Sequence, residues 1–170
     1  GNLIWPLLDT LGLDKDPRPY GFEDDRPDFE LLNVGESVIG ENKSPNKIEE
    51  AVDDLKGRDG YLRDKAFSSD YGIATDGFEW KLIKIELGGD FPQLVTVKKV
   101  SLRNILSSIA ADRGCISQDV SELDVDEELQ KFIDVFEQNN LKKLITEEIP
   151  QQLRDRRKRS VSEFYDLYIE

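Results

Sequence analysis

The chain alternates between segments of helical and of strand-like hydrophobic periodicity. The leucines of residues 3–11 recur at helical spacing and Gly12 follows them, which predicts a short first helix that ends at glycine. Residues 14–27 are charged and contain three prolines, which predicts a loop. Residues 44–55 begin with Ser-Pro, a typical helix start, and continue with an apolar stripe, so they predict a second helix.

Strand-like segments flank two turn signals. Residues 29–43 contain two apolar runs around Gly35-Glu36, and residues 71–87 contain two around Asp76-Gly77, the dipeptide favoured in type I′ turns. Both regions therefore predict β-hairpins. Alternating side chains at residues 94–98 predict a fifth strand.

From Ser101 onward the periodic segments are helical. One helix is expected to begin there and to end near Gly114. Three further apolar stripes at helical spacing lie within residues 129–136, 141–149 and 161–168. The C-terminal third of the chain is therefore predicted to be helical.

This order of elements predicts the α/β fold class, with a mixed sheet flanked by helices. A length of 170 residues corresponds to about one domain and a small appendage. We place the sheet domain at residues 1–114 and a helical appendage at residues 115–170.

The charge balance narrows the possible partners. The chain has 36 acidic and 23 basic residues and a formal net charge of −13. That excess argues against loose electrostatic capture of nucleic acid, so a metal ion or a partner would have to supply positive charge. An acidic surface is equally typical of adaptation to high salt. The composition leaves both interpretations open.

Missing residue types exclude several kinds of chemistry. Histidine is absent, which excludes imidazole-based triads, histidine-metal nucleases and zinc proteases of the H-E-x-x-H type, so catalysis must use carboxylates, lysine or tyrosine. The single cysteine, Cys115, cannot form an internal disulfide; we expect it to be a small buried residue in a reducing, cytoplasmic setting. No apolar run approaches the roughly 20 residues of a membrane span, and no secretion signal is visible, so a soluble protein is expected. The lack of methionine indicates that Gly1 follows a cleaved tag or a cut in a longer protein.

The first hairpin is expected to gather acidic residues. If its strands pair about Gly35-Glu36, counting places Glu30 opposite Glu41. The same register places Asp28 opposite Lys43. Side chains alternate with period two, so these four residues project from one side of the sheet at the open end of the hairpin. Asp28 and Glu41 are then diagonal neighbours, roughly 7–8 Å apart at the backbone, close enough to bind one cation.

Two carboxylates and a lysine suit phosphodiester hydrolysis. Carboxylate oxygens of Asp28 and Glu41 are hard ligands for Mg²⁺, with Mn²⁺ as the alternative ion, and such an ion activates water and neutralises the scissile phosphate. Lys43 would orient that water or stabilise the developing charge. The simpler interpretation is that acids share a face by chance in so acidic a chain, and that Lys43 only pairs with them.

A second Glu-x-Lys triplet, Glu79-Trp80-Lys81, shows that the triplet alone carries no information. It follows a tight turn and has no partner acid at the end of a neighbouring hairpin strand. We expect its lysine on the strand surface and Trp80 in the core.

The residues of the first hairpin carry a resemblance. Pro27-Asp28, twelve intervening residues and then Glu41-Asn42-Lys43 is similar to the signature of PD-(D/E)xK nucleases, an acid, a variable gap and acid-x-lysine on a hairpin. More narrowly, the chain resembles the N-terminal nuclease domain of type I restriction enzyme R subunits. The similar segments, in order, are LLDTLG at 7–12, PDFEL at 27–31, ENKSP at 41–45 and GIATDGFEW at 72–80.

The resemblance implies a restriction-endonuclease-like fold and a Mg²⁺-dependent deoxyribonuclease that acts on DNA, with other restriction-system subunits or domains as partners. It implies that Asp28 and Glu41 bind the metal ion, with the Asn42 carbonyl as a third ligand. By the same resemblance Lys43 is the catalytic lysine. The family's glutamine on the following helix is replaced here by Asp54.

The rival hypothesis is a catalytically inactive nuclease-fold module for protein or DNA binding, whose acidic surface and helical tail serve a partner.

Two C-terminal features are less informative. The basic run at residues 154–159 is expected to be a solvated helix face rather than a phosphate-binding site. Tyr165 and Tyr168, beside Phe164, are expected in the core of a helical bundle rather than in a base-stacking platform.

Overall fold

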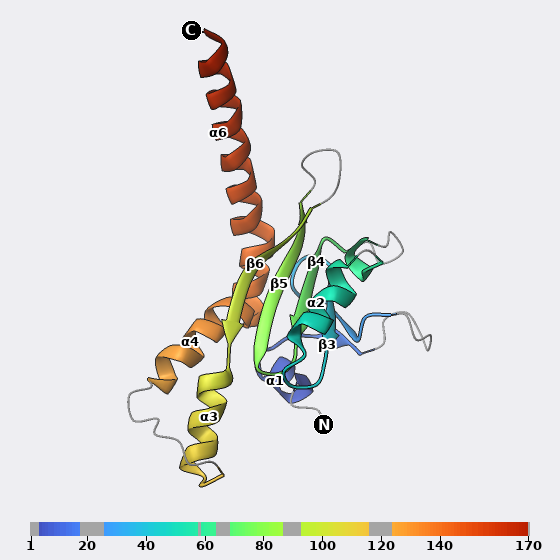
Figure 1. The fold of residues 1–170 in the computed structure, drawn as a ribbon, viewed down its shortest axis with the longest axis vertical. Helices are drawn as coiled ribbons and strands as arrows, with labels where there is room; N and C mark the ends of the chain where they lie inside the picture. Colours follow the sequence, from blue (N-terminus) through green and yellow to red (C-terminus); the bar gives the residue numbers. More distant parts are fainter. Residues whose placement is uncertain are drawn as a thin grey trace.

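The computed structural model describes residues 4–17, 26–57, 59–63, 69–86, 93–115 and 124–169. They form one six-stranded mixed sheet with helices on both faces and a long C-terminal helix that projects from the body (Figure 1). The strands are β1 (Lys15–Asp16), β2 (Phe29–Leu31), β3 (Val38–Asn42), β4 (Tyr71–Thr75), β5 (Glu79–Glu86) and β6 (Gln93–Ser101). The helices are α1 (Ile4–Thr10), α2 (Ile48–Lys56), α3 (Arg103–Asp112), α4 (Val125–Phe136), α5 (Gln138–Lys143) and α6 (Ile149–Ile169), with a 3₁₀ turn η1 (Tyr61–Arg63) and a π-helical turn η2 (Leu144–Glu148). The predicted α/β class, a mixed sheet flanked by helices, is confirmed.

The strands lie in the sheet in the order of the sequence, from β1 to β6. Only β3 and β4 run parallel; all other neighbouring strands are antiparallel. A parallel pair needs a crossover connection, and α2 provides it by packing across one face of the sheet. The ends of β3 and β4 that follow Glu41 and Ala74 therefore meet at one edge of the sheet.

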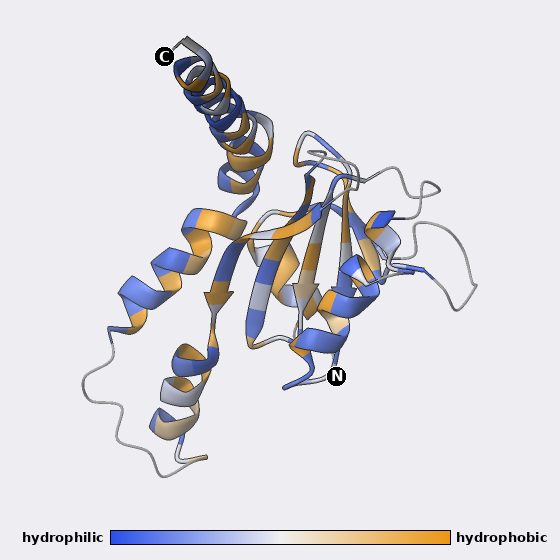
Figure 2. Ribbon diagram, turned by 45° about the horizontal axis from the view of Figure 1, so that its top comes forward, coloured by the Kyte–Doolittle hydropathy of each residue, from blue (hydrophilic) through white to orange (hydrophobic). Residues whose placement is uncertain are grey.

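Each face of the sheet has its own core. On one face, α2 packs Ala51, Val52 and Leu55 against Ile39, Ala74 and Ile83 of the strands. The outer side of α2 is hydrophilic, while apolar residues follow the strands (Figure 2). A helix with one apolar side buries that side against a sheet, so α2 is fixed over β3 and β4.

The opposite face is covered by α1 and by the helices after β6. Trp80 is fully buried there, with its ring centroid 5.2 Å from that of Phe132 and 5.5 Å from that of Phe136. The prediction that Trp80 belongs to the core is confirmed. The boundary after residue 114 stays a prediction, and core residues from both sides of it pack together in this cluster.

The second hairpin is confirmed. Asp76 Oδ1 accepts the backbone N–H groups of Phe78 and Glu79, and Thr75 Oγ1 accepts that of Gly77. Gly77 has φ +87°, a conformation that glycine adopts without a steric penalty. The first helix, the fifth strand and the helix before Gly114 are confirmed as well, as α1, β6 and α3.

The first hairpin is also present, but its predicted register is wrong by two residues. Glu30 lies opposite Ile39 rather than Glu41, and residues 32–37 form the connection. Tertiary contacts hold this wider loop, because Asn33 accepts the N–H of Asp14 at 2.9 Å and donates to the carbonyl of Gly12 at 2.9 Å. Its backbone carbonyl also accepts the side chain of Gln138 at 2.6 Å.

Three further expectations are corrected. Residues 15–16 add an edge strand within the predicted loop, because Lys15 pairs with Leu31. The second helix begins at Ile48, since the chain after Ser44 first makes a turn with Asn46 at φ +67°. Cys115 is exposed.

The distal part of α6 is exposed as well. Phe164, Tyr165 and Tyr168 are 58%, 60% and 75% exposed, so the expected bundle core is wrong. The helix projects from the body toward its C-terminal end, where no other described helix or strand lies beside it (Figure 1). Among the described helices, none is both long and apolar enough to cross a bilayer.

Candidate active site

The candidate site lies where β3 ends beside β4. The ladder between β2 and β3 pairs Phe29 with Gly40, so continuing it by one residue sets Asp28 opposite Glu41. The two-residue difference from the predicted register leaves the faces unchanged, because side chains alternate with period two. It turns the predicted diagonal neighbours into directly opposed ones, which lie closer together.

Backbone hydrogen bonds hold the two acidic segments in place. The N–H of Asn42 donates to Asp28 Oδ2 at 2.8 Å, which ties the residue before β2 to the end of β3. The N–H of Lys43 donates to the carbonyl of Thr75 at 2.9 Å, which keeps the chain against β4 past the end of the strand. Asp28, Glu41 and Lys43 are therefore brought together by backbone geometry on two sides.

Gly40 and Phe29 form the support behind this strand end. A Cβ atom at Gly40 would lie 2.0 Å from Phe29 Cζ, and Phe29 is fully buried. Only glycine leaves room for the ring at this position. Because Phe29 neighbours Asp28 and Gly40 neighbours Glu41, this packing fixes the backbone that carries both acids.

Glu41 is the buried acid of the site. Its side chain is 4% exposed, and its Oε2 atom is buried with no hydrogen-bond partner among the described residues. Burial and the neighbouring Asp28 raise the pKa of Glu41 from 4.5 to about 7, and the hydrogen bond from Lys43 opposes that shift only in part. Both protonation states of Glu41 are thus populated near neutral pH.

Lys43 bridges two carboxylates. Its Nζ donates to Glu41 Oε1 at 2.8 Å and also forms an ion pair with Asp54 of α2. Burial would lower the pKa of Lys43, but the hydrogen bonds to Asp54 and Glu41 outweigh it and raise the pKa above its ordinary value. Lys43 therefore stays charged at neutral pH, and Glu41 is the group of this pair that titrates there.

Asp54 is the residue that sequence reasoning did not assign to the site. It lies in the last turn of α2, with 40% of its side chain exposed, and forms an ion pair with the lysine from there. The only signal for it in the sequence was its place on the helix after the lysine, where the similar family has glutamine. A glutamine offers no charge for an ion pair, whereas Asp54 offers a full one.

Glu30 was expected to face the site as an extra acid. It does share the face of Asp28, but it lies opposite Ile39 and its Oε1 atom accepts the hydroxyl of Ser37 at 2.5 Å. It is therefore engaged with the loop end of the hairpin rather than with Glu41.

The donor set fits a hard divalent cation in a limited way. Among the described residues, no group of three or more Asp, Glu, Cys or His side chains is arranged to hold a metal ion. Asp28 and Glu41 provide two carboxylates, and the unpartnered Oε2 of Glu41 is an atom that a proton or a cation would neutralise. Mg²⁺ is commonly held by one or two carboxylates, with water and substrate phosphates as its other ligands, so two acids are sufficient for that ion.

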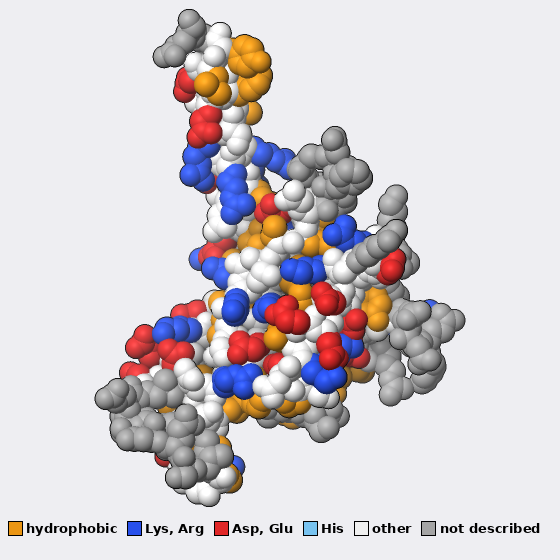
Figure 3. All heavy atoms as spheres, in the orientation of Figure 1, with side chains coloured by type: hydrophobic (Ala, Val, Ile, Leu, Met, Phe, Trp, Pro, Cys, Tyr) orange, Lys and Arg blue, Asp and Glu red, His pale blue; other side chains and the backbone are white. Residues whose placement is uncertain are grey.

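The second triplet is arranged differently from the first, and Lys81, which was expected on the strand surface, is only 14% exposed. Lys81 forms an ion pair with Glu49 of α2 at 2.7 Å, and Glu79 accepts the hydroxyl of Ser101 at 2.8 Å. Acidic and basic side chains are interspersed over the face that carries α2 (Figure 3).

A scan against family models, a search of curated proteins and a search of solved structures each found no match for this chain.

Proposed function

We propose that the chain is a metal-dependent DNA endonuclease domain that hydrolyses phosphodiester bonds, similar to the N-terminal domains of type I restriction R subunits. The observation that carries this proposal is the convergence of three groups at one strand end. Asp28 lies opposite Glu41, and the Lys43 ammonium contacts the Glu41 carboxylate at 2.8 Å. The proposal includes DNA as the substrate, other restriction-system subunits as the partners and the cytoplasm as the location.

In this proposal Asp28 and Glu41 hold Mg²⁺ or Mn²⁺. A bound ion of this kind supplies positive charge for the scissile phosphate and lowers the pKa of water. Asp28 is kept in orientation by the N–H of Asn42, and Glu41 by its burial. Lys43 contributes a fixed ammonium that orients the attacking water or stabilises the charge that develops on the phosphate.

Asp54 acts as a positioning residue in this scheme. If Glu41 turns its carboxylate toward a cation, Lys43 loses part of its contact with Glu41. The ion pair with Asp54 then keeps the ammonium at the strand end and keeps it charged. The contribution is modest, because a partly exposed ion pair is worth about 1 kcal/mol or less.

The test is cleavage of supercoiled plasmid and of linear duplex with Mg²⁺ or Mn²⁺, at low and at high salt. The wild-type chain should cut, and Glu41→Ala should lower the rate about a hundredfold or more, since it removes a ligand and leaves Asp28 alone. Two salt concentrations are needed because the acidic surface repels DNA most strongly at low salt. Cleavage that persists unchanged in Glu41→Ala would exclude this site.

A second candidate function is a nuclease-fold module that binds DNA or protein without turnover. One observation favours it: the described residues hold no cluster of three metal-ligating side chains. This candidate requires that the wild-type chain binds duplex DNA or a protein partner with no cleavage under any of the conditions above, and that Glu41→Ala binds equally well.

A further inference from the structure

A hollow of about 540 Å³ lies between α6 and the end of β5, remote from the candidate active site. It is lined by three apolar side chains, five charged side chains and a serine: Ile85, Leu153, Val161, Asp70, Lys84, Glu86, Arg156, Arg157 and Ser160. Its size lies within the range of about 300–1,000 Å³ that is typical of small-molecule sites.

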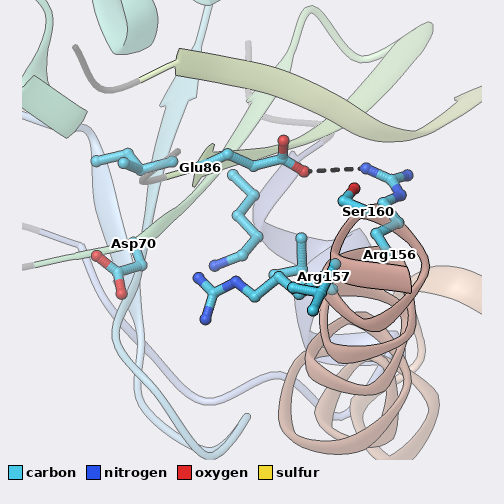
Figure 4. A pocket seen from close by; sticks show the side chains of 9 residues that line it. Asp70, Glu86, Arg156, Arg157 and Ser160 are labelled. Atoms are coloured by element: carbon cyan, nitrogen blue, oxygen red, sulfur yellow. Dashed lines mark hydrogen bonds and ion pairs between the residues drawn. The ribbon is translucent and has the colours of Figure 1, made fainter. Parts of the chain in front are cut away.

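The charges in this hollow are only partly matched. Glu86 Oε1 lies 3.4 Å from Arg156 Nη1, so these two residues neutralise each other (Figure 4). Arg157 has no ion pair or hydrogen bond within the described residues. It extends from α6 across the hollow, while the carboxylate of Asp70 turns away from it (Figure 4). Arg157 therefore brings an unmatched cation into the hollow.

Lys84 adds a second unmatched cation from the opposite wall. Its Nζ lies 4.5 Å from the ring centroid of the buried Tyr71, and within the described residues it has no carboxylate partner. A ring face attracts an ammonium group but leaves its N–H donors unused. The hydroxyl of Ser160, one helical turn after Arg157, also has no hydrogen bond within the described part of the chain. Three donors thus line the hollow without a hydrogen bond or ion pair to either of its two carboxylates, Asp70 and Glu86.

We propose that this hollow binds the phosphoryl group of a nucleotide. The Arg157 guanidinium provides the planar fork that pairs with phosphate oxygens, Lys84 provides a point charge, and Ser160 provides a hydroxyl donor. The apolar side chains of Leu153 and Val161 provide a surface for the rest of the ligand. The phosphoryl group comes either from a free nucleotide or from a nucleic acid end.

The test is titration calorimetry in EDTA, with inorganic phosphate, AMP and adenosine as probes. The wild type should bind AMP, bind phosphate more weakly and not bind adenosine. Arg157→Gln and Lys84→Met should each weaken AMP binding about tenfold or more, because each removes a charged hydrogen bond. Arg159→Gln is the matched control, since Arg159 is on α6 but does not line the hollow; it should stay within about twofold of wild type.

A second arm identifies the source of the phosphoryl group. If it is a nucleic acid end, a 5′-phosphorylated oligonucleotide displaces AMP and the 5′-hydroxyl form does not. If it is a free nucleotide, AMP binds and neither oligonucleotide displaces it. Either result supports the hollow as a phosphoryl site. The proposal is overturned if neither AMP nor phosphate binds to wild type, or if Arg159→Gln loses as much affinity as Arg157→Gln while all variants melt like wild type. EDTA prevents cleavage, so this outcome is independent of the proposed nuclease activity.

Discussion

The sheet contains two Glu-x-Lys triplets, and their surroundings make them chemically different. In Glu41-Asn42-Lys43 the acid and the lysine contact each other, the acid is buried, and a second acid lies opposite it. In Glu79-Trp80-Lys81 the acid bonds to Ser101 and the lysine to Glu49, so each side chain has a partner on another element. The same three-residue pattern therefore gives a coupled cluster with an unpartnered buried oxygen in one place and two separately partnered side chains in the other.

Both triplets lie on interior strands, so the difference is in how far each acid is covered and partnered. The Glu41 side chain is 4% exposed and its Oε2 atom has no hydrogen-bond partner among the described residues, whereas Glu79 is 18% exposed and accepts the hydroxyl of Ser101. Burial without full compensation is what raises the pKa of Glu41 to about 7. The ion pair of Lys81 involves Glu49, whose side chain is 75% exposed, so it contributes about 1 kcal/mol or less to stability. Four experiments use the second triplet as a built-in control for the first.

The largest expected effect is the loss of DNA cleavage in Lys43→Ala, with Lys81→Ala as its control. Lys43→Ala should lower the cleavage rate about a hundredfold to ten-thousandfold, because it removes the ammonium that orients the attacking water or stabilises the developing charge in the proposed reaction. Lys81→Ala should stay within about twofold of wild type, since its charge is paired with Glu49. Equal losses in the two variants would mean that both lysines act only through general attraction of DNA.

The next effect is the pH dependence of stability. Because the folded pKa of Glu41 is raised, the folded state holds its proton up to about pH 7, whereas the unfolded state releases it near 4.5. The contribution of Glu41 to the free energy of unfolding is therefore greatest below pH 4.5. It falls by about 1.4 kcal/mol per pH unit as the pH rises, which amounts to about 3 kcal/mol at pH 7.

Glu41→Gln should remove this fall, and urea unfolding at pH 5 and pH 8 measures it. The variant should be more stable than wild type at pH 8 and similar to it at pH 5. Glu79→Gln, the control, should keep the wild-type dependence. The quantity to compare is the free energy of unfolding of wild type minus that of Glu41→Gln. If this difference stays constant or rises between pH 5 and pH 7, the account of Glu41 is contradicted.

Metal affinity should change by about tenfold to a hundredfold. Calorimetric titration with Mn²⁺ should show weaker binding in Asp28→Asn, because one of two carboxylate ligands is lost. Binding to wild type should strengthen as pH rises through 7, since the cation must displace the proton of Glu41. Glu79→Gln should bind like wild type. Heat of binding that is unchanged in Asp28→Asn would place the cation elsewhere.

The smallest effect concerns Asp54. A double-mutant cycle of Lys43→Ala and Asp54→Asn, measured by thermal unfolding without metal, should give a coupling of about 0.5–1 kcal/mol, as expected for a partly exposed ion pair. Asp54→Asn should also slow cleavage by about tenfold or less. The matched variant, Glu49→Gln beside Lys81, should leave cleavage unchanged. A coupling of zero together with wild-type cleavage would remove Asp54 from the site.

The face shared by Asp28, Glu41 and Lys43 was predictable because it depends only on the alternation of side chains along a strand. The register was not, since it depends on Asn33 and Val34, which pack the connecting loop against distant helices. Because side chains alternate with period two, the two-residue difference in register left Asp28, Glu41 and Lys43 on the same face. A difference of one residue would have put them on opposite faces.

The hydrophobic pattern of a segment does not predict which other helix or strand that segment will contact. Asp54 meets Lys43 only because α2 starts at Ile48 and crosses β3 and β4 at one particular position. The aromatic residues of α6 have the same helical spacing as buried stripes, yet Tyr168 is 75% exposed. Periodicity identifies an apolar side of a helix but does not say whether a partner element covers it.

The central claim is that a divalent cation binds between Asp28 and Glu41, and paramagnetic broadening by Mn²⁺ in amide NMR spectra tests it most directly. At low Mn²⁺ occupancy, the amide signals of Asp28, Glu41 and Asn42 should broaden first, and Asp28→Asn should weaken that broadening. If the first signals to broaden belong to other acidic segments, such as the start of α4 at Asp126–Glu128, while that of Asn42 stays sharp, the claim is contradicted.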